Sequence, residues 1–356
     1  MVILCGTIAV LGIIVFFTFT ACSINKISQM TLNDMIISTT KNNKKAIIAI
    51  GVSKNKETNI AVYGKDGSII SGNEYIFEIG SITKTFTASL LLKAIIEGKI
   101  DLDANINIYL DLPQKEYYPT IRRLITHTSG YKSNYFEMEM ISNFFRRSKN
   151  SFYNISKDKL IERIGKINLK DKDYEFKYSN FGIAVIGAIL SEVYGNYYDV
   201  IINEFITEEL HLKNTNVSDG SGNLSNYWEW ALNDAYVAAG ALTSTIVDML
   251  EYSQLQMDEK QIYLSGTHEM LVKVNATSVN SEKLNIHIDG MGMAWILDNQ
   301  NKIVWHNGGT SSFNSYIGFD SNNNIAVVIL SNLPPNYRIP ATVMGIKLLT
   351  DLQKEQ

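Results

Sequence analysis

Hydrophobic residues recur with a strand-like period at both ends of the chain and with a helical period in the middle. Runs of β-forming residues at 45–52 and 59–64 flank a polar turn, which is typical of a hairpin. Near the other end, Asn-rich turns separate four more short β runs, at 292–297, 302–305, 315–319 and 325–330. An amphipathic helix is predicted after them, over 341–352.

The middle of the chain is predicted to be helical. Apolar spacing predicts helices over 28–43, 120–126, 183–193, 198–209 and 246–256, whereas the polar, basic stretch 142–152 indicates a loop or lid. Sheet halves at both ends with helices between them indicate an α/β (α+β) protein. We therefore expect a discontinuous α/β domain from residues 28–100 and 240–356, and an all-helical insertion from residues 101–239.

One stretch, residues 77–84, combines these patterns with reactive side chains. An apolar run ends at Gly80-Ser81, Lys84 follows three residues later, and a helix is predicted from Thr85 until Gly98 ends it. At a helix start, Ser81 would have Lys84 on the same side one turn on, and free backbone N–H groups nearby. A nucleophilic serine needs such neighbours.

The Ser-x-x-Lys tetrapeptide alone is weak evidence. It also begins at Ser23, Ser38, Ser53, Ser129 and Ser156, and a capping serine beside a solvated lysine is its default interpretation. Two further patterns lie downstream of Ser81. Tyr178-Ser179-Asn180 precedes the apolar helix, and His306-Asn307-Gly308-Gly309 follows a β run. Each of these alone is more often structural.

Together and in this order, the patterns resemble the serine penicillin-recognising superfamily, which includes class C β-lactamases, low-molecular-mass D,D-peptidases and related esterases. The resemblance extends from about residue 45 to 352. It includes two non-catalytic phrases typical of the family, Leu124-Ile125-Thr126-His127-Thr128-Ser129-Gly130 and Ala239-Gly240-Ala241-Leu242-Thr243-Ser244-Thr245. It implies a β-lactamase/transpeptidase-like fold with an antiparallel sheet flanked by helices.

The resemblance also implies roles. Ser81 would attack a carbonyl with help from Lys84, and Tyr178 would carry the proton to the leaving group. Asn180 would hold the substrate's amide side chain, and the strand carrying His306 and Gly308 would run beside the substrate. The backbone N–H groups of Ser81 and Gly309 would form the oxyanion hole.

The acid–base properties of the site and one departure from the family limit what it implies. A tyrosine of ordinary pKa is a poor base near pH 7, so Tyr178 would need a positive charge from Lys84, or from His306 if protonated. The lactamases usually carry lysine where His306 stands, in Lys-Thr-Gly. Because histidine is mostly neutral near pH 7, efficient β-lactam hydrolysis is in doubt while acyl-enzyme formation is expected.

Net charge and the N-terminal residues indicate the partners and the location of the protein. The net charge of −4 argues against nucleic acid as the main partner. Val2–Ala21 is an uncharged apolar run, and Phe19–Cys22 resembles a lipobox with Cys22 as the lipid-attachment residue. Residues 1–22 therefore indicate a signal peptide or a membrane anchor, and we expect an exported, membrane-tethered protein, a monomer in this interpretation.

The remaining candidate residues have plainer interpretations. His127 is predicted to be a structural histidine, and His211, His268 and His287 have no partners at ligand spacing, so neither a metal nor a cofactor is expected. Tyr227, Trp228 and Trp230 are either core residues or the wall of a substrate cleft. The expected activity is acyl transfer from β-lactams or D-alanyl peptides. An esterase or D-amino-acid amidase, or a sensor that acylates without turnover, are the alternatives.

Overall fold

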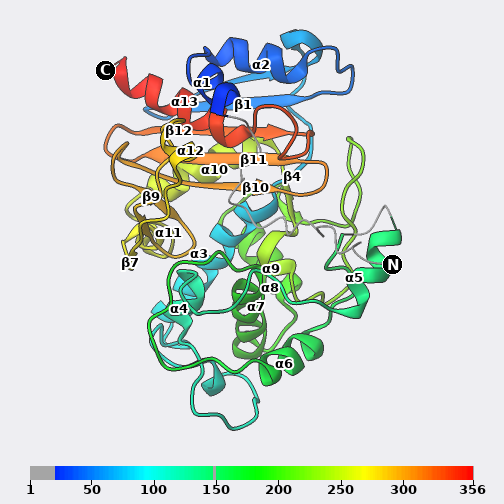
Figure 1. The fold of residues 1–356 in the computed structure, drawn as a ribbon, viewed down its shortest axis with the longest axis vertical. Helices are drawn as coiled ribbons and strands as arrows, with labels where there is room; N and C mark the ends of the chain where they lie inside the picture. The colour runs from blue at the N-terminus through cyan, green and yellow to red at the C-terminus, as the bar shows by residue number, and fades with distance from the viewer. Residues whose placement is uncertain (1–20, 147–149, 356) are drawn as a thin grey trace.

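A computed structural model describes residues 21–146 and 150–355 (Figure 1). The predictions of a signal or anchor over 1–22 and of lipid attachment at Cys22 lie outside the described side chains. Within the described ranges, no helix combines the length and the apolar character needed to cross a bilayer.

Both β-rich ends of the chain contribute to one antiparallel sheet. Strand β1 (Ile48–Lys54) pairs with β2 (Glu57–Tyr63) on one side and with β12 (Ile325–Ser331) on the other. In the described part of the chain the sheet has nine strands, in the order β3-β2-β1-β12-β11-β10-β9-β8-β7. Its other strands are β3 (Ile69–Ile70), β11 (Asn314–Asp320), β10 (Ile303–Gly309), β9 (Ile296–Asp298), β8 (Gly290–Met291) and β7 (Val272–Lys273).

The alternating side chains of this sheet separate two hydrophobic cores. In β12, Ile325, Val327 and Ile329 face the first core, with helices α1 (Ala21–Ser28), α2 (Leu32–Thr40) and α13 (Ala341–Lys354). The residues between them, such as Ala326 and Val328, face the second core, which continues into the helical region. Helix α10 (Ile246–Met257) packs on this second face, and Gly51 of β1 leaves room for the side chain of Leu250.

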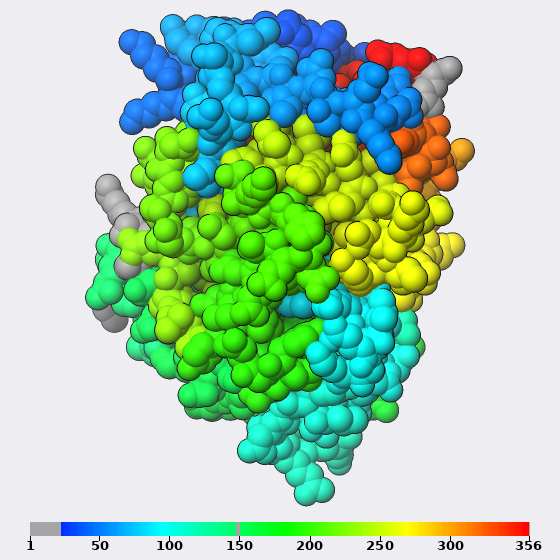
Figure 2. Space-filling model, turned by 180° about the vertical axis from the view of Figure 1, so that it is seen from behind, coloured from blue at the N-terminus to red at the C-terminus, as the bar shows by residue number. Residues whose placement is uncertain are grey.

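The middle of the chain forms the helical half of the molecule, below the sheet in Figure 1. Figure 2 shows from behind that the blue N-terminal segment covers one end and that green and cyan residues form the other, with yellow residues between. The helices of this region are α4 (Ile121–Ile125), α5 (Met138–Phe145), α6 (Lys157–Lys166), α7 (Asn180–Tyr194), α8 (Tyr198–Glu204) and α9 (Val237–Gly240). A π-helical turn, Phe205–Glu209, continues α8.

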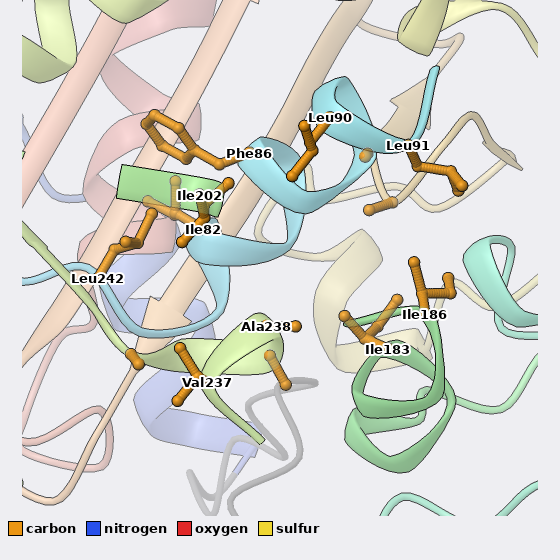
Figure 3. Packing of buried hydrophobic residues seen from close by; sticks show 14 of the residues in the cluster. Ile82, Phe86, Leu90, Leu91, Ile183, Ile186, Ile202, Val237, Ala238 and Leu242 are labelled. Carbon is orange, nitrogen blue, oxygen red and sulfur yellow. The ribbon is translucent and has the colours of Figure 1, made fainter. Parts of the chain in front are cut away.

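Helix α3 (Thr83–Ile96) joins the two halves. Figure 3 shows its Phe86, Leu90 and Leu91 beside residues of α7, α8 and α9. Every residue from Thr83 to Leu91 is buried, so this part of the helix has no exposed side. The helix is enclosed because the helices that pack on the sheet cover one of its sides and the helical region covers the other.

The antiparallel sheet with flanking helices confirms the predicted fold class. The helical region also contains the two-residue strand β5 (Asn216–Val217), which pairs with β6 (Leu242–Ser244) in a small sheet with β4 (Phe77–Glu78). The predicted loop over 142–152 is wrong at its start, because α5 extends to Phe145 and its buried Met140 packs in the second core. The β run predicted at 292–297 forms a strand only from Ile296. The division into two domains stays a prediction.

Candidate active site

The turn that carries Ser81 is clamped between two strands. β4 pairs with β6, and after Ile79 the chain makes a 3-10 turn, Gly80–Ile82, that leads into α3. Gly80 has φ +51°, and a Cβ there would lie 2.6 Å from the backbone nitrogen of Gly309. Only glycine combines that dihedral with such a close approach. Residue 80 therefore brings the Ser81 turn against the end of β10.

Gly308 makes the second close approach. A Cβ on Gly308 would overlap the carbonyl oxygen of Ile79, which accepts a hydrogen bond from Ser315 Oγ at 2.8 Å. The sequence indicated Gly308 as a substrate contact. The structure shows that its missing side chain lets β10 lie against the residues that precede Ser81.

We expect Gly308→Ala to destabilise the protein by about 3 kcal/mol, because the new methyl group would push β10 away from Ile79. Gly165→Ala, in α6, is the matched control. Its new Cβ would stand 3.4 Å from Pro113, so this variant should be more stable by about 0.5–1 kcal/mol. Urea denaturation of both variants measures this. Equal stability of Gly308→Ala and the wild type would show that the contact is not restrictive.

Lys84 reaches Ser81 as the spacing predicted. Its Nζ lies 2.8 Å from Ser81 Oγ and 2.5 Å from the carbonyl oxygen of Ala239 in α9. The side chain is fully buried, and within the described ranges no carboxylate forms an ion pair with it. Burial without a counter-charge holds the pKa of Lys84 well below its usual value. An amine of this kind can accept a proton near neutral pH.

Tyr178 lies beside this pair. Lys84 Nζ stands 5.0 Å from the centre of the Tyr178 ring, and the phenol has no hydrogen-bond partner among the described residues. Burial raises the pKa of Tyr178 far above its usual value, although the nearby Ser81 hydroxyl offsets part of this rise. The expectation that a positive charge would make Tyr178 basic is therefore not met. Tyr178 stays a phenol and can donate a proton.

The side chain of His306, in β10, is buried and does not lie at the surface. Its Nδ1 is 2.6 Å from the carbonyl oxygen of Asn307, which can only accept, so Nδ1 carries the proton. Its ring centre is 6.4 Å from that of Tyr178. Burial, with a contribution from the charge of Lys84, lowers the pKa of His306 to about 3. His306 is thus neutral at physiological pH and supplies no positive charge.

The neutral state of His306 predicts a pH effect on stability. Its folded pKa of about 3 lies below the unfolded value of 6.5, so stability is full above pH 6.5 and is lost toward pH 3. Relative to His306→Gln, the wild type should lose about 2 kcal/mol between pH 7 and pH 5. Urea titrations at several pH values measure the difference. Parallel pH curves for the two proteins would contradict a buried neutral histidine.

A narrow cleft opens beside Ser81. Trp228 and Trp230 line it, as one interpretation of the sequence suggested, whereas Tyr227 is buried and donates to the carbonyl oxygen of Ile76. The full lining is Ser81, Phe152, Asn180, Trp228, Trp230, Tyr236, Ala239, Gly240 and Gly309. Sequence analysis missed Phe152 and Tyr236, which stack with ring centres 4.4 Å apart, because they lie far apart in the chain.

The predicted site residues differ in how they are held. Ser81, Asn180 and Gly309 share the cleft, while Lys84 and Tyr178 lie behind Ser81. Asn180 starts α7, and its side-chain amide donates to Asn134 Oδ1 at 3.2 Å. His127 accepts a hydrogen bond from Ser179 N at 3.3 Å, and its ring lies 4.6 Å from that of Tyr178 at a tilt of 43°, so it supports the tyrosine loop. Among the described residues, no group of three or more His, Cys, Asp or Glu could hold a metal ion.

The chain resembles known proteins both in sequence and in fold. It is 25% identical to Protein flp of Staphylococcus aureus over 281 residues, which is 73% of this chain and 53% of that protein. It is also 25% identical to a Beta-lactamase of Providencia stuartii, over 55% of this chain and 49% of that protein. The chain thus spans about half the length of these curated relatives.

The fold comparison covers nearly the whole chain. The crystal structure of a Beta-lactamase/D-alanine carboxypeptidase from Yersinia pestis superposes with a TM-score of 0.70, at 18% identity, over 94% of this chain and all of that one. The family model described as Beta-lactamase matches residues 41–342. That match includes every candidate residue of the cleft and most of both β-rich ends. The chain therefore belongs to the Beta-lactamase family, whose fold supports a serine hydrolase in general.

Proposed function

We propose that this protein is a serine hydrolase that forms an acyl-enzyme on Ser81, with β-lactams or D-alanyl peptides as acyl donors. The observation that carries the proposal is the buried Lys84 amine, 2.8 Å from Ser81 Oγ and without a carboxylate partner in the described chain. This arrangement is suited to proton removal from a serine.

The proposed reaction uses the side chains in two stages. Ser81 Oγ attacks the carbonyl carbon while its proton passes to Lys84 Nζ. The Tyr178 phenol then donates its proton to the leaving nitrogen or oxygen as that bond breaks, and Lys84 returns a proton to the phenolate. Water repeats the sequence on the Ser81 ester. The backbone N–H groups of Ser81 and Gly309, whose residues both line the cleft, are the proposed oxyanion donors.

One observation favours a second substrate class. No lysine or arginine lines the cleft as described, and His306 is neutral, so the site offers no cation to a substrate carboxylate. β-Lactams and D-alanyl peptides both carry that carboxylate. Donors without a carboxylate, such as the substrates of an esterase or of a D-amino-acid amidase, fit the aromatic lining better.

Intact mass measurement tests the proposal and separates these classes. The full chain is incubated with a fluorescent penicillin, with a D-alanyl-D-alanine peptide and with a short-chain ester. A stable adduct points to a D,D-peptidase or a non-turnover sensor, and a transient adduct with hydrolysed drug points to a β-lactamase. Ester cleavage without an adduct points to an esterase. No reaction with any donor would overturn the proposal.

Membrane tethering through residues 1–22 remains part of the proposal. The sequence supports it through the apolar run and the lipobox-like Phe19–Cys22. Metabolic labelling with a fatty-acid analogue, compared between the wild type and Cys22→Ser, tests attachment. Equal labelling of both proteins would exclude Cys22 as the attachment residue.

A further inference from the structure

A buried carboxyl group lies three residues before the nucleophile. The side chain of Glu78 is 3% exposed, and within the described ranges no lysine or arginine forms an ion pair with it. Its Oε1 accepts a hydrogen bond from the backbone N–H of Trp228 at 2.5 Å, and its Oε2 accepts one from Thr310 Oγ1 at 2.5 Å. Burying a carboxyl group without a cation is costly, so its contacts call for a functional explanation.

Both donors belong to segments that form the cleft. Thr310 directly follows Gly309, and Trp228 lines the cleft. The Trp228 indole also donates from Nε1 to Ser311 Oγ at 2.7 Å. The segment around Trp228 and the residues after β10 are therefore joined both directly and through Glu78. Glu78 itself is fixed by β4, where it pairs with Thr243 of β6. The carboxyl group thus links three segments distant in sequence.

We propose that Glu78 is a positioning residue, whose carboxylate holds Gly309 and Trp228 in place around Ser81 during acylation. The inference rests on the proposed function, since it names what orients the acyl donor in that site. Gly309 would lose its alignment as an oxyanion donor if Thr310 moved, and Trp228 would lose its place in the cleft wall if its N–H lost its acceptor. Hydrogen bonds to a carboxylate are stronger than those to an amide, so a glutamine would hold both segments more loosely.

The protonation of Glu78 supports this role. Burial raises the pKa of Glu78 to about 7, and Tyr227 is the titratable side chain that faces it. Because the folded pKa lies above the unfolded value, the stability that this group contributes is full below pH 4.5 and is lost as the pH rises through 7. Ionised Glu78 therefore lowers stability in the pH range where the proposed role requires it. A charge kept against stability is typical of functional sites.

Glu78→Gln tests the inference, because glutamine has the shape of glutamate. Its amide oxygen can still accept the hydrogen bond from the Trp228 N–H, while the Thr310 hydroxyl would change from donor to acceptor. The matched control is Asp248→Asn, a buried carboxylate away from the cleft that also accepts from uncharged groups, at 2.7 Å from Asn214 N and 2.9 Å from Thr215 Oγ1. The readouts are the rate of Ser81 acylation by a fluorescent penicillin, or turnover of a short-chain ester if no adduct forms, and the Tm of the full-length proteins.

We expect Glu78→Gln to acylate roughly tenfold more slowly at pH 8, with a Tm equal to or above that of the wild type. The ratio of wild-type to Glu78→Gln rates should grow from near one at pH 6 to about ten at pH 8, since Glu78 is protonated at the lower pH. Asp248→Asn should lower the Tm and leave the acylation rate within about twofold of the wild type.

The possible results separate the two proposals. Normal acylation by Glu78→Gln at pH 8, or a rate ratio that does not change with pH, would overturn the positioning role alone. If both variants showed a lower Tm with a proportionate loss of acylation rate, Glu78 would have a structural role. That result would also overturn the positioning role. A wild type without any Ser81-dependent reaction would overturn the proposed function, and with it this inference.

Discussion

Ser81→Ala should abolish covalent labelling and lower the hydrolysis of every acyl donor by at least ~10³-fold. In the proposed reaction this hydroxyl forms the ester, and Lys84 Nζ lies 2.8 Å from its oxygen. Its removal leaves the oxyanion donors and the cleft in place, so a small residual rate is expected. Intact mass after incubation with a fluorescent penicillin measures the adduct, and initial rates measure turnover.

Ser53→Ala provides the matched control. Ser53 also begins a Ser-x-x-Lys tetrapeptide and is fully buried, but it lies in β1, where its hydroxyl accepts from Gln254 Nε2 at 2.9 Å. This variant should keep wild-type labelling. If Ser81→Ala retained an adduct or its activity, the nucleophile would have to be another residue, and the roles of Lys84 and Tyr178 would lose their basis.

Lys84→Met should separate stability from activity. We expect acylation to fall by roughly 10²–10⁴, the range for loss of a positioned general base. Stability at pH 7 should stay the same or rise, because methionine avoids the cost of burying an amine whose pKa burial holds far below its usual value. Stopped-flow acylation and urea denaturation measure the two effects.

The control for this variant lies on the same helix. Lys93 is 26% exposed and pairs with Glu97 at 2.7 Å, so Lys93→Met removes a positive charge from α3 without touching the cleft. It should acylate normally. Wild-type activity in Lys84→Met would assign proton removal to a group other than Lys84 and would require a different interpretation of the buried amine.

Sequence patterns predicted what depends on neighbours along the chain. The i, i+3 spacing placed Lys84 beside Ser81, and the β-forming runs located β1, β2, β9, β10, β11 and β12 to within a few residues. The protonation states were not predictable in this way. Burial is a tertiary property, and it lowers the pKa of Lys84 while it raises that of Tyr178.

The contacts that complete the site connect residues far apart in sequence. The carbonyl of Ala239 accepts from Lys84 across the domain interior, and nothing in the phrase around Ala239 shows this. Glu78 has the alternation of an ordinary strand residue, and its proposed role depends on donors from Trp228 and Thr310. Such pairings require the fold itself, since period and spacing describe only local geometry.

The pairing of β1 with β12 also has a consequence for how the protein is made. Lys54 lies opposite Ile325, so this pairing joins segments separated by roughly 270 residues. At a synthesis rate of about 5–20 residues per second, the first hairpin waits roughly 10–60 s for its partner strand. During that interval β1 presents an unpaired edge, the kind of surface that chaperones cover and that aggregates form on. A lower growth temperature or added chaperone should therefore raise the yield of recombinant protein more than changes in the active site do.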